Sequence, residues 1–208
     1  DTTNPEAMNY LKEQLKAKSS MMESANTAEE VSCMDFSQLI TVRQSCRAYD
    51  PGRSVSREDL TACLEAARLA PSACNAQPYH FTVVTGENAR AVGDLTRSMG
   101  LNGFTPDVPV FVVISEANYN ATSAVGAKVK GQDYRSVDIG IAAAYFTARA
   151  TELGLSTCII GWFDEKKLRQ LVGAKGMVRL VIAVGYAKEG DALRKKVRKD
   201  LETLVTWM

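Results

Sequence analysis

The sequence predicts an α+β fold, with a central, mostly antiparallel sheet flanked by helices. Two strongly apolar runs of strand length, residues 108–114 and 178–185, are typical of strands buried on both faces of a sheet. Helical patterns lie before, between and after them, the longest over about 134–153. Because helices and strands mix without a regular βαβ alternation, this order favours α+β over a doubly wound parallel sheet.

The elements follow from local signals. Phe36, Leu39, Ile40 and Val42 predict a first core helix, and Asp50-Pro51-Gly52 then breaks the chain. Ser56, with Asp59 three residues later, predicts the start of a helix that Pro71 ends. The remaining expected elements are a strand at 80–85, a helix at 87–99, a strand at 108–114, a loop at 116–132, helices at 134–153 and 164–172, a turn and then a short strand at 154–161, and a strand at 178–185.

The chain divides into a leader and one domain. With 208 residues and 46% hydrophobic content, it is large enough for a sizeable core. Residues 1–33 are a polar, helix-capable leader or arm of unknown role, and residues 34–208 form the domain. Met34 as a natural start after a fusion or processed remnant, and a genuine N-terminal arm, are both compatible with the residues. The 116–132 loop is compatible with a lid or binding loop and with plain disorder.

Composition removes several classes of function. The net charge of +1 argues against nucleic acid as a partner. The sequence contains no run of 18 apolar residues, so it predicts no membrane-spanning helix. The five cysteines are widely spaced without a CxxC pair, which predicts no metal site and thiols in a reducing, cytoplasmic compartment. The single histidine, His80, leaves hydrolysis by a histidine-activated nucleophile without a supporting signature.

Two short segments carry ligand-binding chemistry. Arg43, Ser45 and Arg47 alternate, and arginine forks match phosphate or carboxylate oxygens. Residues 70–78 follow a helical pattern with a turn rich in hydroxyl and amide groups, which match ring carbonyls and nitrogens. Taken singly, the first segment is compatible with a solvated turn and the second with a helix stop. Together they favour a planar, polar ligand with a phosphate tail.

In this order the segments resemble the FMN-dependent nitroreductase family. The matching motifs are Arg43-Gln44-Ser45-Cys46-Arg47-Ala48-Tyr49 and Pro71-Ser72-Ala73-Cys74-Asn75-Ala76-Gln77-Pro78-Tyr79. Later segments at 138–163, 180–186 and 196–205 also match, so the resemblance runs from about Asp35 to the C-terminus. Ser156 stands where the family often has glycine, and Asp200 where proline is common.

The resemblance implies a nitroreductase-like fold, with a C-terminal tail extending onto a dimer partner. It implies a homodimer with FMN at the interface, the polar turn reaching the flavin bound mainly by the other subunit. Because the chemistry is on FMN, it implies no catalytic side chain and no metal ligand. The implied FMN-binding residues are Arg43, Ser45, Arg47, Pro71, Ser72, Ala73, Asn75, Gln77, Ile160, Gly161, Lys196 and Arg198.

The implied activity is ping-pong hydride transfer, from NAD(P)H to FMN and then to nitroaromatics, quinones or similar conjugated acceptors. Arg43 and Arg47 are candidates for stabilising charge on the reduced ring, and a backbone amide near Ile160 or Gly161 for a ring contact. Candidate stacking residues are Phe104, Tyr119 and Phe163.

Three alternatives remain open. The first is a specialised flavoenzyme of the same fold, such as a reductive dehalogenase, an enone reductase or a flavin-cleaving enzyme. The second is a non-catalytic flavin-binding module. The third is a protein that has kept the fold and lost the flavin, against which the intact basic motifs argue.

Overall fold

The structure, a computed structural model, describes residues 34–97, 99–119 and 132–208. Residues Asp35–Met208 form one compact unit. The predicted leader at 1–33 and most of the predicted 116–132 loop lie outside the described residues. No helix in the described ranges has the length and apolar character needed to cross a membrane.

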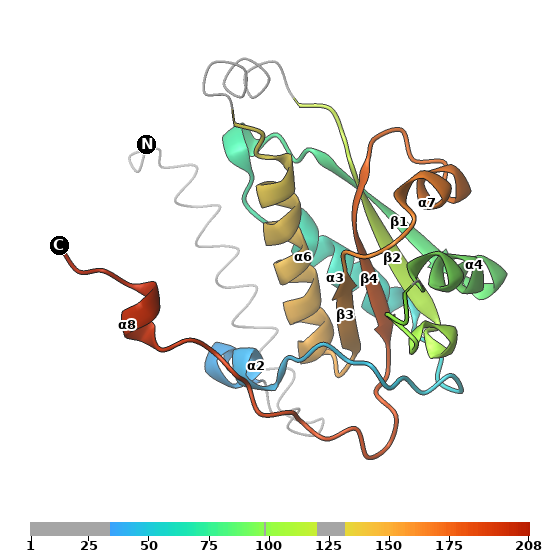
Figure 1. The fold of residues 1–208 in the computed structure, drawn as a ribbon, viewed down its shortest axis with the longest axis horizontal. Coiled ribbons are helices and arrows are strands. Elements are labelled where there is room, and N and C mark those ends of the chain that lie inside the picture. Colours follow the sequence, from blue (N-terminus) through green and yellow to red (C-terminus); the bar gives the residue numbers. More distant parts are fainter. Residues whose placement is uncertain (1–33, 98, 120–131) are drawn as a thin grey trace, which may run out of the picture. The chain divides into compact units, whose positions relative to one another are not determined.

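A four-stranded antiparallel sheet lies at the centre of this unit (Figure 1). Its strands are β1 (Tyr79–Thr85), β2 (Val110–Glu116), β3 (Ser156–Ile160) and β4 (Val178–Gly185), in the spatial order β1-β2-β4-β3. Each neighbouring pair runs antiparallel. The predicted α+β class with an antiparallel sheet is confirmed.

Helices cover both faces of the sheet (Figure 1). The helices of the described residues are α2 (Phe36–Val42), α3 (Arg57–Arg68), α4 (Gly86–Thr96), α6 (Arg135–Glu152), α7 (Glu165–Leu171) and α8 (Leu201–Leu204), with 3₁₀ turns η1 (Ala73–Asn75) and η2 (Thr105–Asp107); α8 lies in the C-terminal tail, away from the sheet. Helices α3 and α6 pack against one face, and α4 and α7 against the other. In β2, Val112 joins the first core cluster and Val113 the second, as expected for a strand buried on both faces.

The predicted start of the second helix is confirmed in detail. Ser56 is the N-cap of α3, and its hydroxyl accepts a hydrogen bond of 3.0 Å from the amide of Asp59. The predicted helix at 87–99 ends early, at Thr96, because the next residue turns extended. The side-chain amide of Asn102 donates 3.0 Å to the carbonyl of Thr96 and so satisfies one of the last helical acceptors.

The first helix is not the core helix that the sequence predicted. In α2 only Leu39 is buried, whereas Phe36 is 72% and Ile40 52% exposed. The helix is short, and its start is fixed by a capping box between Asp35 and Gln38. Helix α2 contacts α6, and Leu39 is the side chain that it buries, while Val42 is half-buried.

Candidate functional site

The Arg43–Arg47 segment lies along the free edge of β3. Arg43 is the C-cap of α2, where the chain turns extended. Ser45 then forms a parallel bridge with Thr157, and the amide of Cys46 donates 2.9 Å to the Thr157 carbonyl. The segment that carries Arg43, Ser45 and Arg47 therefore lies next to β3, the strand that contains Ile160.

The C-terminal tail crosses this segment. The Arg194 guanidinium donates 2.6 Å to the carbonyl of Ser45, and its backbone amide donates 3.0 Å to Gln44 Oε1. Lys196 Nζ donates 2.6 Å to the carbonyl of Arg43. Arg194 was not among the predicted site residues. Its signal was its place in the basic run at 194–199, which does not distinguish a structural contact from a ligand contact.

Four predicted cofactor ligands, Arg43, Arg47, Lys196 and Arg198, gather along the β3 edge and the tail. None of them forms an ion pair with a carboxylate of the described residues. Desolvation, and then the charges of Arg43 and Arg198, lower the pKa of Lys196 from its ordinary value. Uncompensated positive charge of this kind is the electrostatic signature of an anion site.

Ser45 lies between Arg43 and Arg47 in the same segment. Its side chain contacts the buried thiol of Cys158, and the charges of Arg47 and Arg43 act on that thiol. Burial raises the Cys158 pKa, and the arginine charges oppose the rise. Ser45 therefore contacts Cys158 in β3, and the two arginines lie near enough for their charges to act on the same thiol.

The end of β3 leaves space beside the backbone. Ile160 is buried at 3% exposure, and the strand ends there, before Gly161. Apart from its two chain neighbours, a Cβ placed on Gly161 would meet no atom of the described residues within 4 Å. The next residue, Trp162, is 49% exposed. A flat group can therefore approach the main chain here without displacing a side chain.

The polar turn at 71–78 has an unusual backbone. Cys74, Asn75 and Gln77 have φ angles of 50°, 51° and 45°, in the left-handed region. The Gln77 amide donates 3.0 Å to Ser72 Oγ, and Gln77 Nε2 donates 2.9 Å to Asn75 Oδ1. The side chains of Asn75 and Gln77 are exposed, so the turn presents amide groups outward.

Within one chain, the turn and the basic cluster lie at opposite ends of α6 (Figure 1). The amide of Ala73 donates 3.1 Å to Asp138, in the first turn of α6. Arg43 instead lines a small cavity of about 180 Å³ with Thr151, at the other end of that helix. The 13 residues from 138 to 151 span about 20 Å of helix. One chain does not bring the two predicted halves of the site together.

The three candidate stacking residues are engaged within the chain. Phe104 stacks on Tyr49 with ring centroids 5.9 Å apart, and Phe163 packs against the second core cluster. The Tyr119 hydroxyl donates 2.8 Å to Asp133. These contacts explain the three aromatic side chains by packing and hydrogen bonding.

Known proteins share the sequence pattern and the fold of this chain. A family model described as the nitroreductase family matches residues 40–103 and 91–186, most of the described fold. The chain belongs to the nitroreductase family. The predicted resemblance is thereby confirmed. An oxygen-insensitive NADPH nitroreductase of Helicobacter pylori is 26% identical over 200 residues, covering 82% of this chain and 95% of that protein.

Solved structures of the nitroreductase family share the fold. A nitroreductase family protein of Streptococcus pneumoniae superposes with a TM-score of 0.72 at 20% identity, covering 84% of this chain and 100% of the other. An FMN-dependent nitroreductase of Clostridium difficile superposes with a TM-score of 0.63 at 27% identity, covering 81% of this chain and 96% of that one.

Proposed function

We propose that the chain is an FMN-dependent oxidoreductase that uses NAD(P)H to reduce nitroaromatics, quinones or similar conjugated acceptors. The observation that carries this proposal is the gathering of Arg43, Arg47, Lys196 and Arg198 without a carboxylate partner among the described residues. Family membership supports it, as do the NADPH nitroreductase of Helicobacter pylori and the FMN-dependent nitroreductase of Clostridium difficile.

The residues present fit FMN. A phosphate dianion would compensate the charges of Arg43, Lys196 and Arg198 through charge-assisted hydrogen bonds. The space beside Gly161 accepts a flat ring against the main chain. When bound, FMN supplies the two-electron chemistry, so no nucleophilic side chain is needed. Arg43 and Arg47 would supply positive charge to stabilise a reduced ring.

We further propose that a second copy of the chain completes each site. The Pro71–Gln77 turn carries Ser72, Asn75 and Gln77, and about 20 Å of helix separates it from the basic cluster of its own chain. In a twofold dimer, a turn of one copy can face the cluster of the other. Pro71, Ser72, Ala73, Asn75 and Gln77 would then contact the flavin from the partner side.

The C-terminal tail is proposed to extend onto that second copy. Beyond Arg198 the tail exposes Leu201, Leu204 and Trp207 at 68%, 62% and 88%. Large apolar side chains that are this exposed on one short segment mark a surface for burial against another chain. The tail would thus connect the phosphate ligands of its own chain with the surface of its partner.

The test is an anaerobic absorption experiment on the full chain after incubation with FMN and removal of excess. We expect a yellow protein whose flavin band bleaches with NADPH or NADH and returns when a nitroaromatic or quinone is added. FMN without protein, treated in the same way, is the control. A chain that retains no FMN would contradict the proposal. A retained flavin that neither nucleotide reduces would point instead to a non-catalytic flavin-binding module.

A further inference from the structure

The turn at 71–78 needs support from outside itself. L-residues other than glycine are disfavoured at positive φ, and Cys74, Asn75 and Gln77 all adopt it. The bonds from Gln77 to Ser72 and Asn75 hold the turn internally. Such a conformation persists only where the surrounding structure over-determines it.

One carboxylate provides this support from another element. Asp138 Oδ1 accepts the 3.1 Å hydrogen bond from the Ala73 amide, at the start of η1. Asp138 is 2% exposed, and this is the one hydrogen bond of its side chain among the described residues. Its position in the first turn of α6 favours negative charge, because the helix dipole is positive there.

The second carboxylate oxygen of Asp138 has no hydrogen-bond partner in the described part of the chain, which indicates that packing alone does not account for an aspartate at this position. Asp138 Oδ2 and the Tyr79 hydroxyl are both buried without a hydrogen-bond partner among the described residues. Buried polar atoms without partners are rare and cost stability. An apolar residue would continue the buried face of Ile139, Ala142 and Phe146 without that cost. What the carboxylate adds is the acceptor for the turn.

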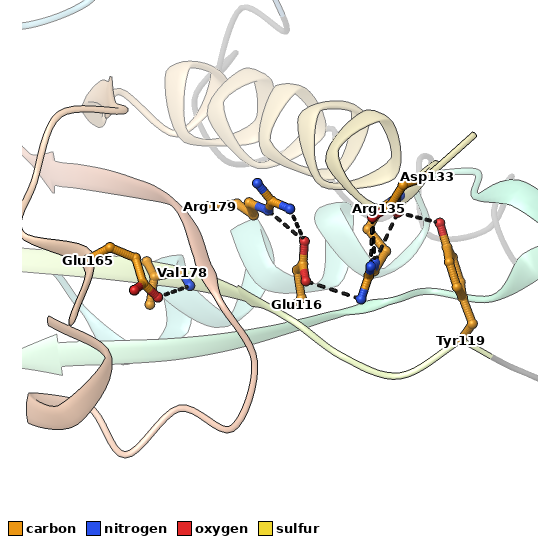
Figure 2. Close-up of polar contacts among 7 residues, drawn as sticks. All are labelled: Glu116, Tyr119, Asp133, Arg135, Glu165, Val178 and Arg179. Atoms are coloured by element: carbon orange, nitrogen blue, oxygen red, sulfur yellow. Dashed lines mark hydrogen bonds and ion pairs between the residues drawn. The ribbon is translucent and has the colours of Figure 1, made fainter. Parts of the chain in front are cut away.

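Ion pairs join the start of α6, the helix that carries Asp138, to the sheet. Figure 2 shows Glu116, at the end of β2, between Arg179 of β4 and Arg135, the first residue of α6. Arg179 Nε donates 2.6 Å to Glu116 Oε1, and Arg135 Nη1 lies 3.2 Å from Glu116 Oε2. The Glu116 side chain is only 9% exposed. These contacts tie the start of α6 to the sheet, one helical turn before Asp138.

We propose that Asp138 is a positioning residue of the flavin site, whose buried carboxylate holds the left-handed turn that presents Asn75 and Gln77. This inference rests on the proposed function for its consequence, flavin affinity, but the hold on the turn is a property of the chain alone. A turn already held in its binding conformation loses less entropy when the ligand binds, which strengthens binding.

The test compares Asp138→Asn, Asp138→Ala and Ala73→Pro in the full chain, with and without FMN. Asparagine retains the acceptor, alanine removes it, and proline removes the donor. Proline is tolerated at the first position of a helical turn, and Ser72 before it is already extended. Asp94→Asn on α4 makes the same chemical change at an exposed position and is the matched control.

Two quantities are measured: hydrogen exchange of the amides in 74–78, and the dissociation constant for FMN. For D138A and A73P we expect exchange to quicken and FMN binding to weaken by about tenfold each, the factor for one lost hydrogen bond. D138N should stay within about threefold of the wild type, since it keeps the acceptor. The double variant D138A/A73P should be no worse than the poorer single variant, because both remove the same bond.

The outcomes separate this inference from the proposed function. If D138A only lowers the melting temperature, with local exchange and FMN affinity equal to those of D138N, the residue is merely structural and the inference is wrong. If D138A does not fold, the exchange of A73P without FMN decides, because Ala73 is itself a proposed flavin contact: unchanged exchange in 74–78 would overturn the inference. If the wild type binds no FMN, the proposed function fails, while the exchange data without FMN still decide the hold on the turn.

Discussion

At the residue scale, the site is defined by positive charges that the described chain leaves uncompensated. Lys196 illustrates the effect, since its pKa is lowered from 10.5 by desolvation and by Arg43 and Arg198. A depressed lysine pKa means that the folded chain holds this proton less tightly than the unfolded chain does. Binding of an anion reverses the effect, so ligand affinity and the protonation of Lys196 are coupled.

This coupling predicts the pH dependence of FMN binding. The second ionisation of a phosphate monoester has a pKa of about 6, so FMN affinity should rise between about pH 5 and pH 7 as the dianion forms. It should fall again on the alkaline side, below the ordinary lysine pKa of 10.5, as Lys196 loses its proton. Riboflavin, which has no phosphate, should bind more weakly and show no rise. Fluorescence titration of the chain across this range measures both ligands.

Substitutions in the C-terminal tail test whether Lys196 and Arg198 bind the phosphate of FMN. The double variant K196M/R198M should weaken FMN binding by about tenfold or more and leave riboflavin binding nearly unchanged, because only the phosphate contacts are lost. Lys195, exposed in the same tail, gives the matched control K195M. Equal affinities for FMN and riboflavin in the wild type would refute a phosphate site at this cluster.

At the element scale, the sequence predicted where most helices and strands lie, but not always which face of a helix is buried. Apolar spacing located α6 to within a residue at each end, and the two apolar runs located β2 and β4. Amphipathic spacing could not separate the core face of α6 from a second apolar face. Val137 and Tyr145 are apolar residues of this helix, yet they are 50% and 44% exposed. Burial is decided by neighbouring elements, which local pattern does not contain.

The exposed face of α6 carries a prediction of its own. Gly140 and Ala144 lie between Val137 and Tyr145, and all four are exposed in the single chain. Small residues flanked by large apolar ones allow close helix contact, so we expect this face to be covered in the proposed dimer. Tyr145→Glu should shift the chain toward monomer in light scattering and lower its FMN content. Leu171→Glu on α7, also at an exposed apolar position, should leave the mass unchanged. A Y145E chain that remains fully dimeric would contradict this assignment.

At the scale of the whole molecule, the sequence identified two candidate ligand-binding motifs but could not show how far apart they lie. Arg43 and Ser72 lie close in sequence, yet the fold places their segments at opposite ends of α6. Asp138 was missed for a related reason. An acidic residue on a predicted helix reads as solvent-facing, and only the packing shows that it is buried against the turn. Distances between segments depend on tertiary contacts that motif order does not encode.

Each proposed flavin site combines the basic cluster of one copy with the polar turn of another. The most direct test of this arrangement is a heterodimer purified through two tags, pairing a K196M/R198M chain with an N75A/Q77A chain. One of its two sites would combine the intact cluster of the second chain with the intact turn of the first, and the other site would carry both defects.

The measurement is the FMN content and NADPH-dependent turnover of this heterodimer, beside both variant homodimers and the wild type. If two copies build each site, the heterodimer regains about half of the wild-type values, while both homodimers stay low. If each site lies within one chain, both heterodimer sites carry one defect, and the heterodimer performs no better than the homodimers. That second result would contradict the account.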